Sequence, residues 1–340
     1  MPGFSICPNY TSARVACDTN VRSLTRRLLR FAERGFFYLV EKKREPLFQE
    51  VFFGEEFSDK HFLVIRRRDR YAGLFSYFYT NLCWMLYARD HGMIPVVDMQ
   101  THRNLYQRWR DWRRVNSWEL FFEQPFGYSL PDISRAAHVL VVTGVDPEVC
   151  KLPVDVWDSS PDANSRLQSV REFVREHLKV KISKLEVYQN EGFESALPSG
   201  VVGVFVRGTD YVTVKPRGST VQPSAEMIIA KVREYLLNGH ESEWVYLVTE
   251  DPSVASRFKE AFGDRLILSK QRFLKYDGGL LGDSPEIIGV VDRGLAYLKA
   301  IVDLSRCRSL IAGRANGAAG AMLLTSGYDY TYFFDLGSYP

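Results

Sequence analysis

Three apolar runs in the second half of the chain each end in residues that could bind a phosphate or a nucleotide base. Apolar runs of about five residues predict buried parallel strands. The carboxyl ends of such strands share one edge of a sheet, and ligands of open α/β folds bind at that edge. The ends of these runs are Arg207-Gly208-Thr209, Thr249-Glu250-Asp251 and the stretch Gly313-Arg314-Ala315-Asn316-Gly317.

Arg207 is the candidate cation at this edge. A guanidinium offers planar, paired donors that fit a diphosphate, and Gly208 would let a phosphate approach the backbone closely. The alternative is that Arg207 pairs with a carboxylate such as Asp210. In that case Asp210 orients the arginine or caps a helix.

Glu250 and Asp251 have two interpretations that remain open at this point. Asp followed by Pro is a common start of a helix, with Asp as the N-cap and Pro as the first helical residue. That explains Asp251 without a ligand but leaves Thr249 and Glu250 unexplained. A carboxylate here could instead accept hydrogen bonds from N1 and N2 of guanine.

The stretch 313–320, GRANGAAG, is rich in small residues and precedes a predicted helix. Exposed backbone N–H groups and the positive end of a helix favour a phosphate. The spacing matches neither the dinucleotide fingerprint nor a P-loop, so neither an NAD enzyme nor a kinase is indicated. Close helix packing is the alternative, although Arg314 and Asn316 favour a ligand.

The first half of the chain supplies candidates for the opposite side of a site. Gly73 and Ser76 lie in the turn after a predicted strand, and Asp98 ends the next strand. Asp98 and Glu123 are the carboxylates that could act as general base on an acceptor hydroxyl. The alternative for both is a surface or capping carboxylate.

Composition limits the class of protein. The 340 residues are 46% hydrophobic and 25% charged, which is typical of a soluble globular protein with two domains. A net charge of +3 argues against a general polyanion binder, and we expect no nucleic-acid partner. Basic residues are dense in 66–70 and 103–114, which predicts a solvated face, or a surface for an anionic acceptor or a membrane.

Five scattered cysteines include no Cys-x-x-Cys pair, so we expect neither a disulfide framework nor a metal site. We see no secretory signal and no transmembrane anchor, and we expect a cytoplasmic protein. The segment 23–40 is amphipathic and rich in arginine. It either packs on the protein or lies on a membrane, which leaves peripheral membrane contact open.

Strands and helices are predicted to alternate along most of the chain. We expect two Rossmann-like, doubly wound α/β domains that face each other across a cleft, 1–185 and 186–340. The predicted strands are 61–65, 94–98, 138–143, 201–206, 244–249, 265–268, 309–312 and 330–334, and the predicted helices are 76–91, 165–180, 224–237, from 252, 287–304 and from 317.

The order of these motifs resembles a known superfamily. GVFVRGTD from Gly203, YLVTEDPS from Tyr246 and LSRCRSLIAGRANG from Leu304 resemble the three motifs of the GDP-fucose-dependent fucosyltransferases of the α1,6 and protein O-fucosylating type. YAGLFSYFYTNLCWMLYARDHGMIPVV from Tyr71 is similar to their opening glycine turn and helix. The resemblance implies a GT-B fold and an inverting, metal-independent transferase without a cofactor. GDP-fucose would be the donor substrate, and a glycan or polysaccharide the acceptor.

By this resemblance, Arg207 contacts the donor β-phosphate, Asp251 beside Glu250 reads guanine, and 313–317 cradles phosphate. Two positions differ from the family pattern. Gly208 stands where the α1,6 enzymes have a second arginine, and Lys215 stands where they have the catalytic glutamate. Lys215 could hold phosphate or an acidic acceptor. A transferase for another GDP- or UDP-sugar, or a non-catalytic nucleotide- or glycan-binding protein, therefore remains an alternative.

Overall fold

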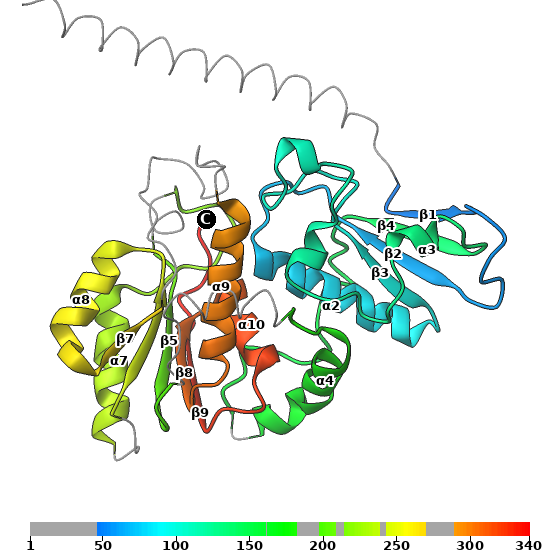
Figure 1. Cartoon of the computed structure of the whole chain (residues 1–340). Helices are drawn as coiled ribbons and strands as arrows, with labels where there is room; N and C mark the ends of the chain where they lie inside the picture. The colour runs from blue at the N-terminus through cyan, green and yellow to red at the C-terminus, as the bar shows by residue number, and fades with distance from the viewer. Residues whose placement is uncertain (1–45, 161, 182–196, 209–213, 239–242, 270–288) are drawn as a thin grey trace, which may run out of the picture. The chain divides into compact units, whose positions relative to one another are not determined.

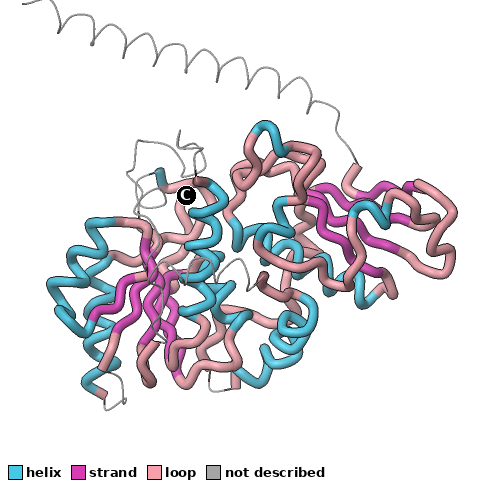
Figure 2. The backbone as a smooth tube through the Cα atoms, in the orientation of Figure 1, coloured by secondary structure: helices cyan, strands magenta, loops and turns pink. Residues whose placement is uncertain are grey.

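The computed structural model describes residues 46–160, 162–181, 197–208, 214–238, 243–269 and 289–340. The predicted amphipathic segment 23–40 lies outside these residues, as do Thr209 and Asp210. Within the described ranges, no helix combines the length and the apolar character needed to cross a membrane. Figure 2 shows the alternation of strands and helices that the sequence predicts.

The first sheet has the strand order β1-β4-β2-β3. Strands β2, β3 and β4 are mutually parallel, as predicted, and β1 pairs antiparallel with β4. In this register Arg66 lies beside Asp98 on one side and Thr143 on the other, so the polar ends of three strands meet at one edge. The strands are β1 (Phe48–Val51), β2 (Phe62–Arg66), β3 (Ile94–Asp98) and β4 (Val139–Thr143).

Helix α2 (Leu74–Asp90) connects β2 to β3 and is buried along most of its length. Gly92 has a φ of 66°, which a glycine adopts without strain, and it turns the chain from α2 into β3. The region between β3 and β4 contains short helices, and a longer helix follows β4. These are η1 (Trp109–Asp111), η2 (Ser117–Leu120), α3 (Leu130–Ile133) and α4 (Ala163–His177).

The second sheet is entirely parallel, with the order β7-β6-β5-β8-β9 (Figure 1). From its central strand β5, the chain builds outward on one side through β6 and β7, then crosses over to build β8 and β9 on the other. This is the doubly wound order of a Rossmann-like sheet. Its strands are β5 (Val202–Val206), β6 (Val245–Thr249), β7 (Leu266–Leu268), β8 (Ser309–Gly313) and β9 (Tyr330–Phe334), and its helices are α7 (Ala225–Leu237), α8 (Pro252–Phe262), η3 (Gly263–Arg265), α9 (Val290–Leu304) and α10 (Asn316–Leu324).

Strand β5 shows why helices cover both faces of this sheet. Val202, Val204 and Val206 join one apolar cluster with residues of α7 and α8, whereas Phe205 joins another with residues of α9 and α10. Side chains of a strand alternate between its two faces. A strand that is apolar at every position therefore needs an apolar helix layer on each side.

Helix α2 and helix α10 pack against each other through a glycine. A Cβ atom at Gly320 would lie 2.1 Å from Cδ1 of Phe75, so only glycine fits there. The other end of α10 is held by α4, where the buried Arg171 donates from Nε to the carbonyl of Met322 at 2.8 Å. That carbonyl lies in the last turn of α10, where carbonyl groups have no N–H partner within the helix. One apolar cluster thus includes residues of both sheets.

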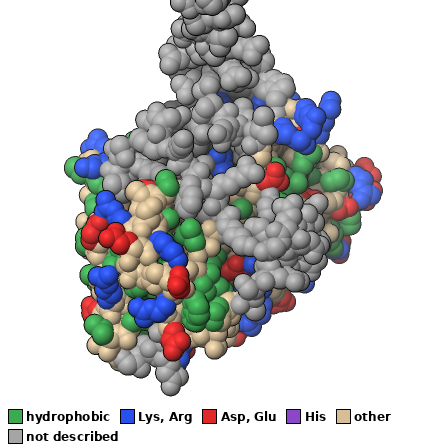
Figure 3. Space-filling model, turned by 60° about the vertical axis from the view of Figure 1, so that its left-hand side comes forward, with side chains coloured by type: hydrophobic (Ala, Val, Ile, Leu, Met, Phe, Trp, Pro, Cys, Tyr) green, Lys and Arg blue, Asp and Glu red, His purple; other side chains and the backbone are tan. Residues whose placement is uncertain are grey.

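The α/β class with largely parallel sheets is confirmed, and the predicted strands lie within one or two residues of the observed ones. Strand β1 was not predicted. Three of its four residues are exposed, so FQEV lacks the apolar run or clean alternation that marks a strand. The boundary between 185 and 186 stays a prediction. On the face shown in Figure 3, basic and acidic side chains of the described residues lie interspersed.

Candidate functional site

The loops that follow β6, β5 and β8 lie next to one another at the carboxyl edge of the second sheet. β5 and β8 are the neighbouring strands between which the direction of winding reverses. Loops on the two sides of such a switch point diverge and leave a crevice, where α/β proteins bind their ligands. The predicted residues Arg207 and 313–317 flank this point.

The loop after β5 is packed tightly against the loop after β6. Arg207 is partly buried and Gly208 is buried. A Cβ at Gly208 would lie 2.5 Å from Cβ and 2.6 Å from Oδ2 of Asp251. A larger side chain at this position would collide with Asp251, so the close packing of these two loops requires a glycine here.

Asp251 caps helix α8, as the first of its two interpretations predicts. Its Oδ1 accepts a hydrogen bond from the backbone N–H of Ser253 at 2.8 Å, and Pro252 occupies the first helical position. Thr249 is fully buried, and its Oγ1 accepts from the backbone N–H of Asp251 at 3.2 Å. Thr249 therefore positions the loop, and guanine recognition by Glu250 and Asp251 stays a prediction.

The glycine-rich stretch forms the end of β8 and the start of α10. Gly313 is buried, and a Cβ there would lie 2.6 Å from Oε1 of Gln222. Arg314 forms an ion pair with Asp335 at 3.0 Å, and its carbonyl accepts from Nε2 of Gln222 at 3.0 Å. Close packing therefore accounts for Gly313, and local pairing accounts for Arg314.

Helix α10 begins with an end that its own sequence does not cap. Its N-cap residue is Ala315, which has no side-chain oxygen to accept a hydrogen bond from the first N–H groups of the helix. Asn316, the first helical residue, is exposed. The positive end of α10 thus lies at the switch point, in the position where a helix can bind a phosphate.

Two tyrosines, Tyr297 and Tyr106, lie beside these loops. The hydroxyl oxygen of Tyr297, on α9, would lie 2.3 Å from a Cβ at Gly317. Burial raises the pKa of Tyr297, and so does the nearby carboxylate of Glu250, whereas the guanidinium of Arg207 opposes the rise. Tyr297 is therefore a neutral hydroxyl close to the start of α10, to Arg207 and to Glu250.

Tyr106, in a loop of the first half of the chain, lies beside helix α9 and near Arg207. A Cβ at Gly294, one turn before Tyr297 on α9, would lie 3.1 Å from Cε1 of Tyr106. Burial raises the pKa of Tyr106, and the charge of Arg207 opposes that rise. Gly294 lies almost two hundred residues after Tyr106 in the chain, so local sequence patterns do not predict this contact.

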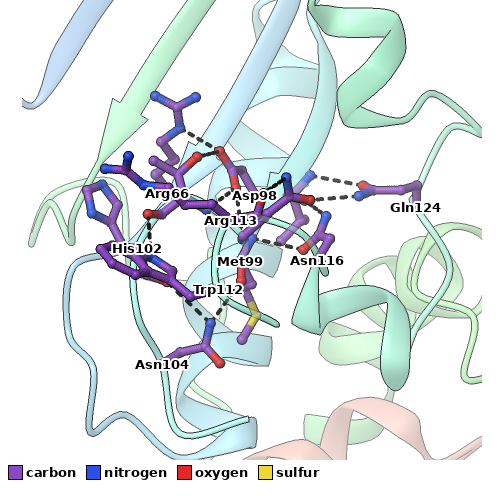
Figure 4. Close-up of polar contacts among 12 residues, drawn as sticks. Arg66, Asp98, Met99, His102, Asn104, Trp112, Arg113, Asn116 and Gln124 are labelled. Carbon is purple, nitrogen blue, oxygen red and sulfur yellow. Dashed lines mark hydrogen bonds and ion pairs between the residues drawn. The ribbon is translucent and has the colours of Figure 1, made fainter. Parts of the chain in front are cut away.

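Asp98 is buried and engaged by four donors (Figure 4). Oδ2 pairs with Nε of Arg66 at 2.7 Å and accepts from Oγ1 of Thr101 at 2.7 Å. Oδ1 accepts from the backbone N–H groups of Gln100 and Thr101, both at 2.9 Å. This arrangement fixes the turn after β3, in agreement with the capping alternative, and the role of Asp98 as general base stays a prediction.

Replacement of Asp98 by asparagine is expected to lower the free energy of unfolding by about 2 to 3 kcal/mol, because it leaves the Arg66 guanidinium in a mostly buried site without its counter-charge. The measurement is urea unfolding of Asp98→Asn, with Glu123→Gln as the control. Glu123 is exposed, so its replacement should lower the free energy of unfolding by less than about 0.5 kcal/mol. Wild-type stability of Asp98→Asn would contradict the structural role.

Three other candidate residues, Ser76, Gly73 and Lys215, lie among the described residues. Ser76 accepts from Nη1 of Arg67 at 2.9 Å through its side chain, so it holds that arginine in the turn after β2. Gly73 is the exposed N-cap of α2, and among the described residues, its own chain neighbours and helix aside, no atom lies within 4 Å of a Cβ there. Lys215 is exposed and has a φ of 47°, which is unusual for a residue other than glycine.

Among the residues that the structure describes, histidine, cysteine, aspartate and glutamate side chains form no group of three or more that could hold a metal ion. Arg207, Gly208, Asp251 and the start of α10 are brought to one edge, whereas the described contacts of Asp98 are all within the first half of the chain.

No protein-family model matches the chain, and no curated protein matches it. Solved structures to which it is similar include NodZ alpha-1,6-fucosyltransferase soaked with GDP-fucose, at 16% identity over 78% of this chain and 93% of that chain, with a TM-score of 0.45. Fucosyltransferase NodZ from Bradyrhizobium has 16% identity over 78% and 94%, with a TM-score of 0.41. POFUT1 in complex with GDP has 10% identity over 82% and 99%, with a TM-score of 0.42. The structures that resemble this chain thus include fucosyltransferases, the enzymes whose motifs its sequence resembles.

Proposed function

We propose that the chain is an inverting, metal-independent glycosyltransferase of the GT-B type that moves fucose from GDP-fucose to a glycan hydroxyl. The observation that carries the proposal is the switch point of the second sheet. There the guanidinium of Arg207 follows β5, and the uncapped start of α10 follows β8, the next strand. A fixed cation and a helix N-terminus on neighbouring strands suit a diphosphate.

In the proposed reaction the acceptor oxygen forms a bond to the anomeric carbon while the bond from that carbon to the β-phosphate oxygen breaks. GDP leaves with added negative charge, which Arg207 and α10 stabilise without reorganisation. The hydroxyl proton passes to a carboxylate of the first half. Glu123 is exposed, whereas the oxygens of Asp98 are held by Arg66 and Thr101, so Glu123 is the first of the two to test.

The guanine assignment is also part of the proposal. Glu250 lies in the loop after β6, beside the loop that carries Arg207. It would accept hydrogen bonds from the guanine edge while Asp251 keeps its role as helix cap. The glycine turn at Gly73 and the side chains of Lys215 and Asn316 are exposed, and they could approach phosphates of the same donor. The choice of fucose follows from the motif resemblance.

One observation favours a second candidate, a protein that binds a nucleotide sugar without transferring it. Lys215 occupies the position of the family's catalytic glutamate, and it is an exposed cation in a left-handed conformation. The ammonium group of a lysine offers three donors and no acceptor, so it cannot take the place of a carboxylate base. A transferase would then need a carboxylate from elsewhere. A transferase for another GDP- or UDP-sugar is the remaining alternative.

The test is a thermal-shift panel with GDP, GDP-fucose, GDP-mannose, UDP-sugars and ADP in the presence of EDTA. A ligand at about one hundred times its Kd stabilises the folded chain by about 2.7 kcal/mol. We expect GDP and GDP-fucose to raise the Tm by several degrees. Absence of a shift with every guanine nucleotide would refute the donor class. Intact recovery of GDP-fucose after long incubation with glycans would favour the binding protein.

A further inference from the structure

The loops that follow β2 and β3, residues 66–73 and 98–118, carry an excess of positive charge. They contain nine arginines and three aspartates, whereas the whole chain has a net charge of only +3. Both loops leave the carboxyl edge of the first sheet. The loop after β4 contains several acidic residues, so the positive charge is confined to the side of β2 and β3.

Ion pairs with the three aspartates involve Arg66, Arg67, Arg108 and, at 3.8 Å from Asp111, Arg110. We call the arginines Arg70, Arg110, Arg113 and Arg114 of these loops the basic edge. Arg110, Arg113 and Arg114 are exposed, and Arg70 is partly buried with its guanidinium 4.9 Å from the ring centre of Tyr71. The side chains of Arg110, Arg113 and Arg114 therefore present positive charge to solvent in the loop that follows β3.

Arg113 is held in place by its surroundings (Figure 4). Its φ is 59°, in the left-handed region that costs a residue with a side chain about 1 kcal/mol. Its carbonyl accepts from Nε2 of Gln100 at 3.1 Å, and its guanidinium lies 4.8 Å from the ring centre of Trp112. Nε1 of Trp112 in turn donates to the carbonyl of Thr101 at 3.2 Å. These contacts hold the backbone of Arg113 in its left-handed conformation and its exposed guanidinium beside Trp112.

The loop that carries Arg113 also reaches the donor side of the site. Tyr106, in the same loop, lies against Gly294 of α9, and the positive charge of Arg207 acts to lower the pKa of its hydroxyl. The first turn of α2, which follows the other basic loop, contacts α10 through Phe75 and Gly320. An acceptor whose hydroxyl reaches a donor bound at Arg207 would therefore pass the loop that carries Tyr106 and Arg113.

We propose that the basic edge binds the acceptor, and that this acceptor is an anionic glycan with carboxylate or sulfate groups close to the hydroxyl that is modified. The inference rests on the proposed function. Guanidinium groups bind such anions through paired donors. The rings of Trp112, partly buried, and Tyr71, exposed, offer apolar faces to sugar rings beside those charges.

The experiment measures binding of the full chain, in the presence of GDP, to a tetrasaccharide with alternating glucuronate residues, to its sulfated form and to its carboxyl-reduced neutral form. We expect the acidic forms to bind at least tenfold more tightly than the neutral one. We expect this preference to fall as sodium chloride rises from about 50 to 500 mM, because salt screens exposed charges. Equal affinity for all three forms, or no binding of either acidic form, would overturn the proposal.

The matched variants are Arg113→Gln/Arg114→Gln and a control, Arg175→Gln/Arg233→Gln, which removes the same charge from exposed positions of α4 and α7. We expect Arg113→Gln/Arg114→Gln to weaken binding of the acidic tetrasaccharides by about threefold to tenfold. The control should weaken it by less than about twofold. Equal loss in both would show nonspecific attraction and overturn the proposal. Arg113→Lys keeps the charge and should restore part of the affinity.

Two further readouts separate the possible failures. The thermal shift with GDP reports the donor site, so a normal GDP shift without acidic glycan binding refutes the basic edge alone, and a missing GDP shift refutes the proposed function. Vesicles with about 30% anionic lipid test the remaining explanation of the charge. Binding of the wild type to such vesicles, lost in Arg113→Gln/Arg114→Gln and without glycan binding, would assign the surface to a membrane and overturn the proposal.

Discussion

Replacement of Arg207 by alanine is expected to weaken GDP binding by about one hundredfold and to reduce turnover of the donor further. A charge-assisted contact between a guanidinium and a phosphate contributes more than a neutral hydrogen bond. Its contribution grows as negative charge develops on the departing phosphate. The measurements are titration calorimetry with GDP and the rate of donor consumption.

Arg257→Ala is the control for this variant, because Arg257 is exposed on α8 and pairs with Glu226 away from the switch point. It should bind GDP like the wild type. Arg207→Lys keeps the charge but loses the paired donors, so we expect intermediate affinity. Wild-type GDP affinity of Arg207→Ala, in a variant whose Tm without ligand is unchanged, would show that the diphosphate is bound elsewhere.

Replacement of Gly320 by valine is expected to lower the free energy of unfolding by about 3 kcal/mol or more. Its Cβ alone would lie 2.1 Å from the ring of Phe75, which is buried. Overpacking of this kind forces side chains and backbone apart. For a folded unit of this size, the expected fall in Tm is about 5 °C.

Gly73→Val is the matched control. Gly73 has an extended backbone, with φ of −71° and ψ of 162°, and within the part of the chain that the structure describes a Cβ here would meet no atom within 4 Å beyond its neighbours in the chain. The same substituent should therefore change the Tm by less than about 2 °C. Equal losses in the two variants would mean that the contact between α2 and α10 does not limit stability.

Most strands of the fold could be predicted because each is a short apolar run with a defined end. The faces of β5 show the physical reason, since a strand covered on both sides must be apolar throughout. Strand β1 could not be predicted, because its pairing depends on β4, about ninety residues later, and not on its own composition. The short helix α3 was also missed, although Ser129 and Asp132 form a capping box.

For the candidate site, the sequence predicted which strand ends would meet but not what each side chain would touch. Asp251 was recognised as a possible cap because the signal, Pro252, is the next residue. The engagement of Asp98 by Arg66 was not foreseen, because the partner is 32 residues away in sequence. The positions of Tyr106 and Tyr297 near Arg207 depend on how helix α9 packs, which periodicity alone does not determine.

The glycine contacts between the first half of the chain and the helices of the second sheet also restrict how this protein can change. Helices α10 and α9 have glycines at positions 320 and 294 because the rings of Phe75 and Phe121 fill the space that a side chain there would need. A larger residue at either glycine would require a smaller one at its partner. Substitutions at these positions should therefore occur in compensating pairs, for instance alanine at 320 together with leucine at 75. In an alignment of related chains, these two contacts should appear as covariation between positions about 170 to 250 residues apart.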